Sequence, residues 1–150
     1  MTEQMFKSAE EIFEGRLRGN QLIASSIAMS PLDARLLWVS DRMESVTWLD
    51  LDDNCLGDQG LRELADCSLL AKIQYLNLNN NKLTDDGVSY LAASPHLFNL
   101  KRLHLKGNSI NGQGVLALFN SETLTNLQTF QIHEGWSCKK REGWRYKSRD

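Results

Sequence analysis

The sequence predicts an α/β solenoid in which parallel strands line one side and helices line the other. Three observations predict this fold. The first is a period of 27 residues, free of insertions, that separates Val46, Ile73, Leu100 and Leu127. The second is a period-two alternation of apolar residues after each of these positions, and the third is a helical spacing of apolar residues in the second half of each repeat. A fixed period of this size is typical of stacked repeats, which offer a surface and do not by themselves imply an active site.

Each repeat is expected to begin with a short strand whose apolar residues point inward in pairs. These pairs are Leu49 and Leu51, Leu76 and Leu78, Leu103 and Leu105, and Phe130 and Ile132. A helix follows, with apolar residues spaced as in Leu61, Leu64 and Ala65. Because a helix follows every strand, we expect parallel strands and right-handed crossovers. Helices pack about 10 Å apart and strands about 4.8 Å apart, so the stack should bend into a short horseshoe with concave strands and convex helices.

One polar residue recurs just after each complete strand. Asn54, Asn81 and Asn108 stand 27 residues apart. A short amide side chain can bond main-chain groups that a turn leaves unpaired. We therefore predict that the three residues form a structural ladder along the core.

The expected helix starts carry two further recurring features. Residues suited to an N-cap stand just ahead of the helical stripes: Asp58, Thr84 and Asp85. Glycines recur at one register near the helix starts: Gly60, Gly87 and Gly114. A glycine at a fixed place in every repeat indicates a close approach of the backbone to a neighbour.

Residues 1–45 precede the first clear repeat and are assigned to a helical N-terminal cap. One helical face is formed by Met5, Phe6, Ala9, Ile12, Phe13 and Leu17. A Ser30–Pro31 pair opens a second helix, whose Leu37 and Trp38 stand 27 residues before Leu64 and Ala65. The segment 20–29 is compatible with a helix or with a poor edge strand. Terminal repeats need a covering element because their core is otherwise open, and we expect 1–45 to supply it.

The repeats are assigned to residues 46–72, 73–99 and 100–126, with a partial repeat at 127–134. Residues 135–150 break the pattern, and the segment 136–150 carries a net charge of +4 against −6 for the rest of the chain. Its candidate contact residues are Trp136, Lys139, Lys140, Arg141, Trp144 and Arg145. Two interpretations stay open. We favour a C-terminal cap that closes the edge of the sheet, and the alternative is a nucleic-acid or anionic-surface contact by charge attraction and ring stacking.

Composition narrows the cellular setting. The chain has 150 residues, a net charge of −2 and three cysteines without C-x-x-C spacing, which argues against a disulfide framework or a zinc site. A reducing compartment is the simplest interpretation of such cysteines. Residues 1–15 are too charged for a secretory signal, and no apolar stretch is long enough to span a membrane. We expect a cytoplasmic protein, and the alternative is a secreted effector without a cleavable signal peptide.

The repeated unit resembles that of a known family. The pattern in IQYLNLNNNKL, which starts at Ile73, resembles the leucine-rich repeat. The longer segment TDDGVSYLAASPHLFNLKRLHLKGNSI, from Thr84 to Ile110, is similar to the ribonuclease-inhibitor-like subfamily in its bacterial form. The resemblance covers residues 46–134. It implies a right-handed α/β horseshoe whose concave face binds other proteins.

Side chains that alternate with the inward leucines should point outward onto the concave face, in rows that cross the strands. The candidate partner-binding residues are Trp48, Asp50, Asp52, Tyr75, Asn77, Asn79, Arg102, His104, Lys106, Gln131 and His133. These rows change from acidic through neutral to basic along the stack, and Trp, Tyr and Arg are enriched at binding hot spots. We predict a module that binds a protein partner with the opposite charge order. The simpler alternative is a polar cover over the sheet, with Trp48 and Tyr75 covering each other.

Catalysis is not expected from these residues. His104 should lie two strands from Asp50, about 10 Å away, which is too far for the hydrogen bond of a catalytic triad. His133 has no orienting carboxylate nearby, and nothing next to Cys55 marks it as an activated thiol. The sequence contains no Gly-rich phosphate loop and no metal-ligand spacing. We therefore predict a protein without enzymatic activity, cofactor or metal.

Overall fold

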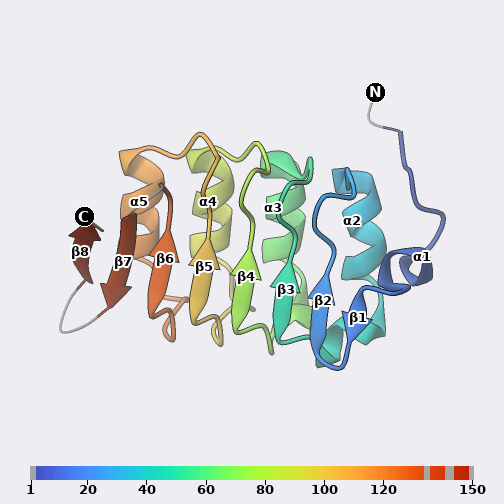
Figure 1. The fold of residues 1–150 in the computed structure, drawn as a ribbon. Helices are drawn as coiled ribbons and strands as arrows, with labels where there is room; N and C mark the ends of the chain where they lie inside the picture. The colour runs from blue at the N-terminus through green and yellow to red at the C-terminus, as the bar shows by residue number, and fades with distance from the viewer. Residues whose placement is uncertain (1–2, 134–135, 141–143, 149–150) are drawn as a thin grey trace.

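The computed structural model describes residues 3–133, 136–140 and 144–148, and it shows one sheet backed by helices (Figure 1). The strands are β1 (Leu17–Arg18), β2 (Gln21–Ile23), β3 (Trp48–Asp50), β4 (Tyr75–Asn77), β5 (Arg102–His104), β6 (Thr129–Gln131), β7 (Trp136–Lys140) and β8 (Trp144–Ser148). The α-helices are α1 (Ala9–Phe13), α2 (Pro31–Trp38), α3 (Gly57–Ala65), α4 (Asp85–Ala92) and α5 (Gly112–Phe119). Two short 3-10 helices, η1 (Asp41–Ser45) and η2 (Ser68–Leu70), lie in the return turns.

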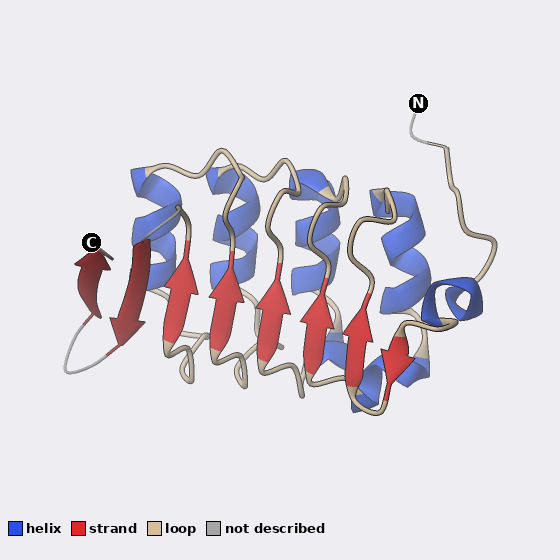
Figure 2. Cartoon of the chain, in the orientation of Figure 1, coloured by secondary structure: helices blue, strands red, loops and turns tan. Residues whose placement is uncertain are grey.

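Strands β2 to β6 are parallel and lie side by side in chain order. Each strand pairs with the next in a register of one repeat, so that Trp48 lies opposite Tyr75 and Tyr75 lies opposite Arg102. Helices α2 to α5 all lie on the same side of this sheet (Figure 2). The predicted parallel strands are confirmed, and their alternation with helices fits a solenoid.

The core lies between the strands and the helices. The inward residues of the strand segments, such as Leu49, Leu76 and Leu103, are 0% exposed. The helical stripe packs against them, and Leu64 and Leu91 are equally inaccessible. Truncating a leucine in such a core to alanine typically costs 2–5 kcal/mol. The repeated apolar positions therefore supply the main stabilisation of the stack.

Each asparagine after a strand bonds backbone groups in its own turn and in the preceding repeat. The Asn81 amide donates to the carbonyl oxygens of Leu51 (2.8 Å) and Asn79 (2.9 Å), and its Oδ1 accepts from the Leu56 N–H (3.4 Å). Asn54 and Asn108 make corresponding bonds one repeat away on either side. These contacts join neighbouring repeats at the end of the sheet where the strands lead into the helices.

The helix starts differ from the sequence expectation at two aspartates. Thr84 does cap α4, because its hydroxyl accepts from the Asp86 N–H (3.3 Å). Asp58, however, bonds the next repeat: its carboxylate accepts from the Thr84 N–H (2.8 Å) and from the Thr84 hydroxyl (2.5 Å). Asp85 accepts from the Asn111 N–H in the same way (2.7 Å). These carboxylates link consecutive helix starts and do not cap their own helices.

Two of the recurring glycines, Gly87 and Gly114, make room for these carboxylates, whereas a Cβ on Gly60 would meet Leu56 (3.0 Å). A Cβ atom on Gly87 would lie 2.3 Å from Asp58 Oδ1, and one on Gly114 would lie 2.6 Å from Asp85 Oδ1. Both distances are too short for any real Cβ contact, so a side chain would displace the aspartate. The predicted close approach is therefore present, and its partner is a side chain of the preceding repeat.

Residues 1–45, which were expected to form a helical cap with 20–29 left open, contain strands as well as helices. Strand β2 pairs in parallel with β3, and the ambiguous segment 20–29 thus includes a strand. Helix α1 is shorter than predicted, because Leu17 begins β1, which pairs antiparallel with β2. The apolar residues of this segment occur in two consecutive runs, 22–24 and 27–29, so they show no period-two alternation that would identify the strand.

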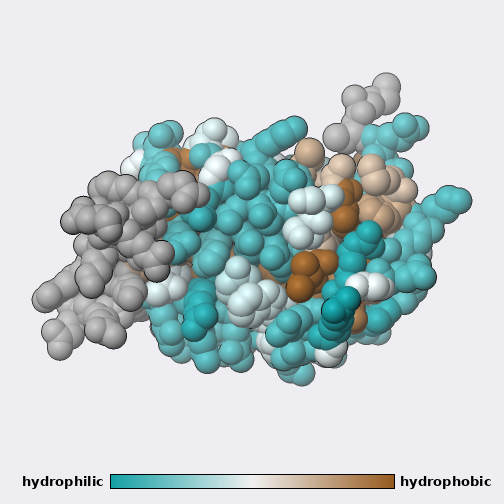
Figure 3. Space-filling view, in the orientation of Figure 1, coloured by the Kyte–Doolittle hydropathy of each residue, from teal (hydrophilic) through white to brown (hydrophobic). Residues whose placement is uncertain are grey.

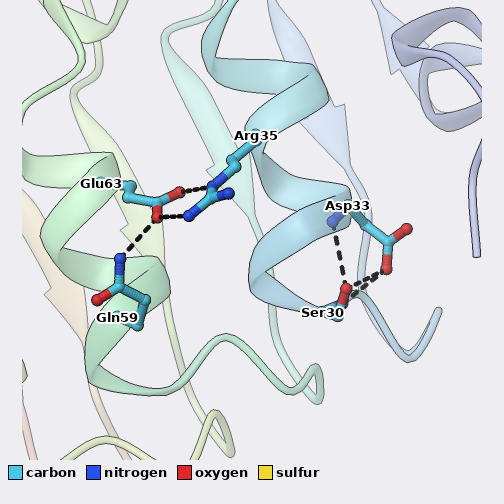
Figure 4. Close-up of polar contacts among 5 residues, drawn as sticks. All are labelled: Ser30, Asp33, Arg35, Gln59 and Glu63. Atoms are coloured by element: carbon cyan, nitrogen blue, oxygen red, sulfur yellow. Dashed lines mark hydrogen bonds and ion pairs between the residues drawn. The ribbon is translucent and has the colours of Figure 1, made fainter. Parts of the chain in front are cut away.

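The start of α2 has the predicted cap, and it also anchors the beginning of the chain. Ser30 and Asp33 form a reciprocal capping box (Figure 4). Asp33 is 0% exposed, and its Oδ1 accepts from the backbone N–H groups of Met5 (2.7 Å) and Phe6 (3.0 Å). These bonds lower the pKa of Asp33 below its ordinary value of 3.8, although burial alone, the largest single effect, would raise it. The carboxylate therefore holds residues 5 and 6 against α2.

At the other end, β7 pairs antiparallel with β6, and β8 pairs antiparallel with β7. Cys138 on β7 is 5% exposed and lies in the core cluster. The predicted tail residue Arg141 lies outside the described residues. The same holds for the side chains of the other tail candidates, which are Trp136, Lys139, Lys140, Trp144 and Arg145. Their backbone forms a hairpin that continues the sheet.

Candidate functional site

The strand face is the side of β3 to β6 that points away from the helices. Two rows cross it: Trp48, Tyr75, Arg102 and Thr129 form the first, and Asp50, Asn77, His104 and Gln131 form the second. The predicted residues Asp52, Asn79, Lys106 and His133 follow these strands. Figure 3 shows a mainly hydrophilic surface over β4 to β6 and an apolar patch over β2.

Three rings lie in sequence across β3, β4 and β5. The rings of Trp48 and Tyr75 are stacked, with centroids 3.6 Å apart and planes inclined by 14°. Tyr75 meets His104 edge-on at 5.1 Å and 72°, and its hydroxyl lies 3.3 Å from His104 Nδ1. All three side chains are half-buried. The stack fixes the rings in place while leaving part of each surface open to solvent.

Burial and nearby charges shift the pKa values of Tyr75 and His104 in this ring cluster. Burial raises the pKa of Tyr75, and the carboxylates of Asp50 and Asp52 raise it further. Burial lowers the pKa of His104 below its ordinary value of 6.5, and the positive charge of Lys106 adds to the effect. His104 is therefore neutral at pH 7. A neutral imidazole can accept a hydrogen bond from the Tyr75 hydroxyl at Nδ1.

The acidic residues of β3 are held by bonds from their neighbours. Asp50 Oδ1 accepts from the Asp52 N–H (3.0 Å), and Asp52 Oδ1 accepts from the Asn80 amide (3.0 Å). The hydroxyl of Ser26 donates to Asp53 (2.9 Å). These bonds place three carboxylates at the end of one strand without neutralising them.

Two of the predicted site residues are engaged in bonds that support neighbouring turns. Asn77 is only 7% exposed, and its Oδ1 accepts from the Asn79 N–H (3.1 Å). The Oδ1 of Asn79 accepts from the Lys106 N–H (2.7 Å). Asn77 was expected to be exposed to a partner, but it is buried between Asp50 and His104 in the pairing register. It leaves little surface to a partner.

A hollow of ≈ 360 Å³ lies at the beginning of the strands. Its lining residues are Thr47, Trp48, Gln74, Tyr75, Lys101, Arg102 and Gln128. Four lining residues precede the four strands at one register and were not among the candidate partner-binding residues: Thr47, Gln74, Lys101 and Gln128. The 27-residue spacing alone could have identified these four as a row.

Strand β2 extends the face beyond the predicted residues. Gln21 lies opposite Trp48, and Ile23, which is 46% exposed, lies opposite Asp50. Counting back one repeat from Trp48 and Asp50 reaches these positions. The signal was overlooked because β2 lacks the leucine pair that marks the other strands.

Three segments match the family model of the Leucine Rich repeat: residues 43–65, 70–92 and 96–119. A search of curated proteins finds no match. The three matches coincide with the strand–helix units of β3, β4 and β5, and they support a leucine-rich repeat protein. Such repeats generally mediate protein–protein interaction and are typically not enzymatic.

The described residues offer little for other chemistry. No group of three His, Cys, Asp or Glu residues among them could hold a metal ion. No helix in the described ranges has the length and apolar character needed to cross a membrane. On the strand face Asn77 stands between Asp50 and His104 in the pairing register, so the histidine and this carboxylate are two strands apart.

Proposed function

We propose that the protein is a non-catalytic interaction module whose strand face binds a protein partner. The observation that carries the proposal is the stacked pair of Trp48 and Tyr75, which is partly open and lies between acidic β3 and basic β5. Aromatic rings held rigidly lose little conformational entropy on binding and are frequent hot spots. Flanking charges of opposite sign add orientation and specificity.

The test uses the double variant Trp48→Ala, Tyr75→Ala in capture from the native cell lysate. We expect loss of the captured partner. The circular dichroism spectrum should remain that of the wild type, and the unfolding transition should remain cooperative. The control is Tyr90→Ala, because Tyr90 is an exposed aromatic residue on the helix side, 42% exposed. A folded double variant that retains its partner at wild-type yield would exclude the strand face as the binding site.

We also infer the finer architecture. The 27-residue period and an α-helix in every repeat support the ribonuclease-inhibitor-like type, with a right-handed horseshoe and a concave strand face. We assign the two ends to covering roles: residues 1–45, where Ile12 and Phe13 of α1 are buried, and residues 135–150, where β7 pairs with β6. Deleting either end should expose core leucines, which increased binding of a hydrophobic dye would detect.

For localisation we propose the cytoplasm, with a secreted effector as the alternative. The support is that Cys55, Cys67 and Cys138 are all free. Burial raises the pKa of the Cys67 and Cys138 thiols, which keeps them protonated and unreactive. Fractionation of native cells and their medium with an antibody to this chain distinguishes the two locations.

A second candidate function is binding of nucleic acid or an anionic surface through residues 136–150. The net charge of +4 in this segment favours it. Such binding should weaken steeply as salt concentration rises and should vanish when the segment is removed. Binding through the strand face should survive in moderate salt. A salt titration with a labelled oligonucleotide therefore separates the two functions.

A further inference from the structure

We propose that the strand face recognises an extended peptide segment that crosses the strands, with a basic side chain over β3 and an acidic side chain over β5 three residues away. This inference rests on the proposed function and specifies its partner. It follows from the charges on the two strands, from the ring pair between them and from the spacing of the strands.

The β3 end of the face suits a cationic side chain. Tyr75 covers one face of the Trp48 ring, and on the other side Trp48 lies opposite Gln21, which is exposed. A cation is attracted to the open face of a Trp ring. The carboxylate of Asp50 lies two residues further along the same strand, and Asp52 follows. Both carboxylates act electrostatically on Tyr75, so the ring pair lies in a negative field.

The β5 end suits an anionic side chain. Lys101 and Arg102 line the hollow beside the ring pair, and both are exposed. Within the described part of the chain neither forms an ion pair. Gln74 and Gln128 line the same hollow and can donate hydrogen bonds to a carboxylate. An arginine fork can bind a carboxylate with two parallel bonds.

The strand spacing sets the separation of the two charges. β3 and β5 are separated by β4, so they lie about 9.6 Å apart at the usual interstrand distance. An extended chain in the polyproline II conformation advances about 3.1 Å per residue with three residues per turn, so residues i and i+3 point to the same side and lie about 9.3 Å apart. In an α-helix the same separation requires residues i and i+7, and the helix would be about 10 Å wide.

The hollow favours the extended form over the helix. Its volume of ≈ 360 Å³ is spread along the first residues of β3 to β6 and is bounded by single side chains. A space of this size holds a few side chains and not the full width of a helix. The ring pair then lies under the peptide backbone between the two charged side chains.

Selection from a random nine-residue peptide library displayed on phage tests the inference, with the immobilised full chain as bait. We expect enrichment of peptides with a basic and an acidic residue three positions apart, in either order because a peptide can cross the face in either direction. Binding of these peptides should fall at least tenfold with Trp48→Ala, Tyr75→Ala.

Charge variants identify the two ends. Arg102→Glu should weaken the selected peptide at least tenfold, and replacing the acidic residue of the peptide with lysine should restore most of the loss. Asp52→Asn should weaken binding several-fold without affecting the acidic end of the peptide. The matched control Lys7→Glu changes an exposed charge before α1 and should leave affinity unchanged.

The outcomes separate this inference from the proposed function. Enriched peptides without the charge pair, whose binding is still lost with Trp48→Ala, Tyr75→Ala, would overturn the peptide chemistry and leave the strand face as the binding site. Enriched peptides that bind the double variant as well as the wild type would overturn both. Absence of any enrichment would overturn the inference, because a preformed extended site should select ligands from such a library.

Discussion

The turns after the strands and the strand face differ in how strictly their residue types repeat. In the turns after the strands, Asn54, Asn81 and Asn108 are identical and make corresponding bonds. On the strand face, Trp48, Tyr75 and Arg102 occupy one register but are three different residue types. The asparagine amide both donates to and accepts from backbone groups of two neighbouring repeats, and all three complete repeats use it. A side chain that points to solvent has no such constraint, and its variation is available for recognition.

The largest loss of stability is expected from a change in the turns after the strands. Asn81→Ala removes the bonds to Leu51 O, Asn79 O and the Leu56 N–H, and leaves buried backbone groups without partners. We expect a loss of about 3 kcal/mol in the free energy of unfolding, measured with urea. The matched change Asn126→Ala removes one exposed bond, to Phe98 O, and should cost less than about 1 kcal/mol. Equal effects of the two variants would refute a special role for the ladder.

A second break concerns the glycines of the helix starts. Gly87→Ala should destabilise the protein by about 1–3 kcal/mol, because its Cβ would collide with Asp58 Oδ1. Gly112→Ala is the control, since nothing lies within 4 Å of that Cβ and alanine favours a helix by about 1 kcal/mol. Thermal unfolding should therefore shift in opposite directions. Adding Asp58→Ala to Gly87→Ala should recover part of the loss, and no recovery would mean that the collision is not with the carboxylate.

The strand face should show a pH dependence of stability that arises from His104. Its pKa is lowered in the folded protein, chiefly by burial, so below pH 6.5 the unfolded chain binds this proton more readily. Stability should therefore fall as the pH decreases from 7 towards 5, by at most about 1.4 kcal/mol per pH unit from this group. His104→Gln should flatten that part of the pH profile relative to wild type. An NMR titration in which His104 has a pKa of 6.5 or above would contradict the expectation.

The smallest effect is expected on the helix side. Arg35 forms a two-bonded ion pair with Glu63, and Gln59 donates to the same carboxylate (Figure 4). The arginine side chain is 54% exposed, so solvent screens the pair. Arg35→Ala should leave the urea midpoint of unfolding almost unchanged, and any shift should be smaller still in 0.5 M salt. A loss of stability as large as that of Asn81→Ala would show that this contact is as important as the repeated bonds.

The sequence predicted the repeats well because their physical requirement is periodic. The leucine pairs and the turn asparagines each appear at a fixed spacing, and the parallel strands follow from them. Strand β2 was only one of two open interpretations of residues 20–29, because Gln21–Ile23 has one buried residue and no leucine pair. The predicted N-cap role of Asp58 was also wrong. An N-cap and a contact with the next repeat both favour aspartate at the start of a helix, so the residue type does not distinguish them.

Other contacts share a register without sharing a residue type. Cys67 Sγ donates to the Trp38 carbonyl, and the Ser94 hydroxyl donates to the Ala65 carbonyl, each one repeat apart. A thiol and a hydroxyl serve the same purpose here, so comparison of letters does not reveal the relationship. For the candidate site, the sequence placed Trp48 and Tyr75 on one face. It could not give their stacking, because ring orientation depends on packing.

The turns after the strands have a consequence for how the molecule could change in length. Ser26, Asp53, Asn80 and Gly107 stand one repeat apart and all adopt positive φ. Asn80 Oδ1 also fills the space that a side chain on Gly107 would need. Each repeat thus presents a surface that fits the repeat after it. A gene segment encoding one whole unit could be duplicated in frame and find matching surfaces on both sides, whereas an insertion of any other size would leave every later contact out of step.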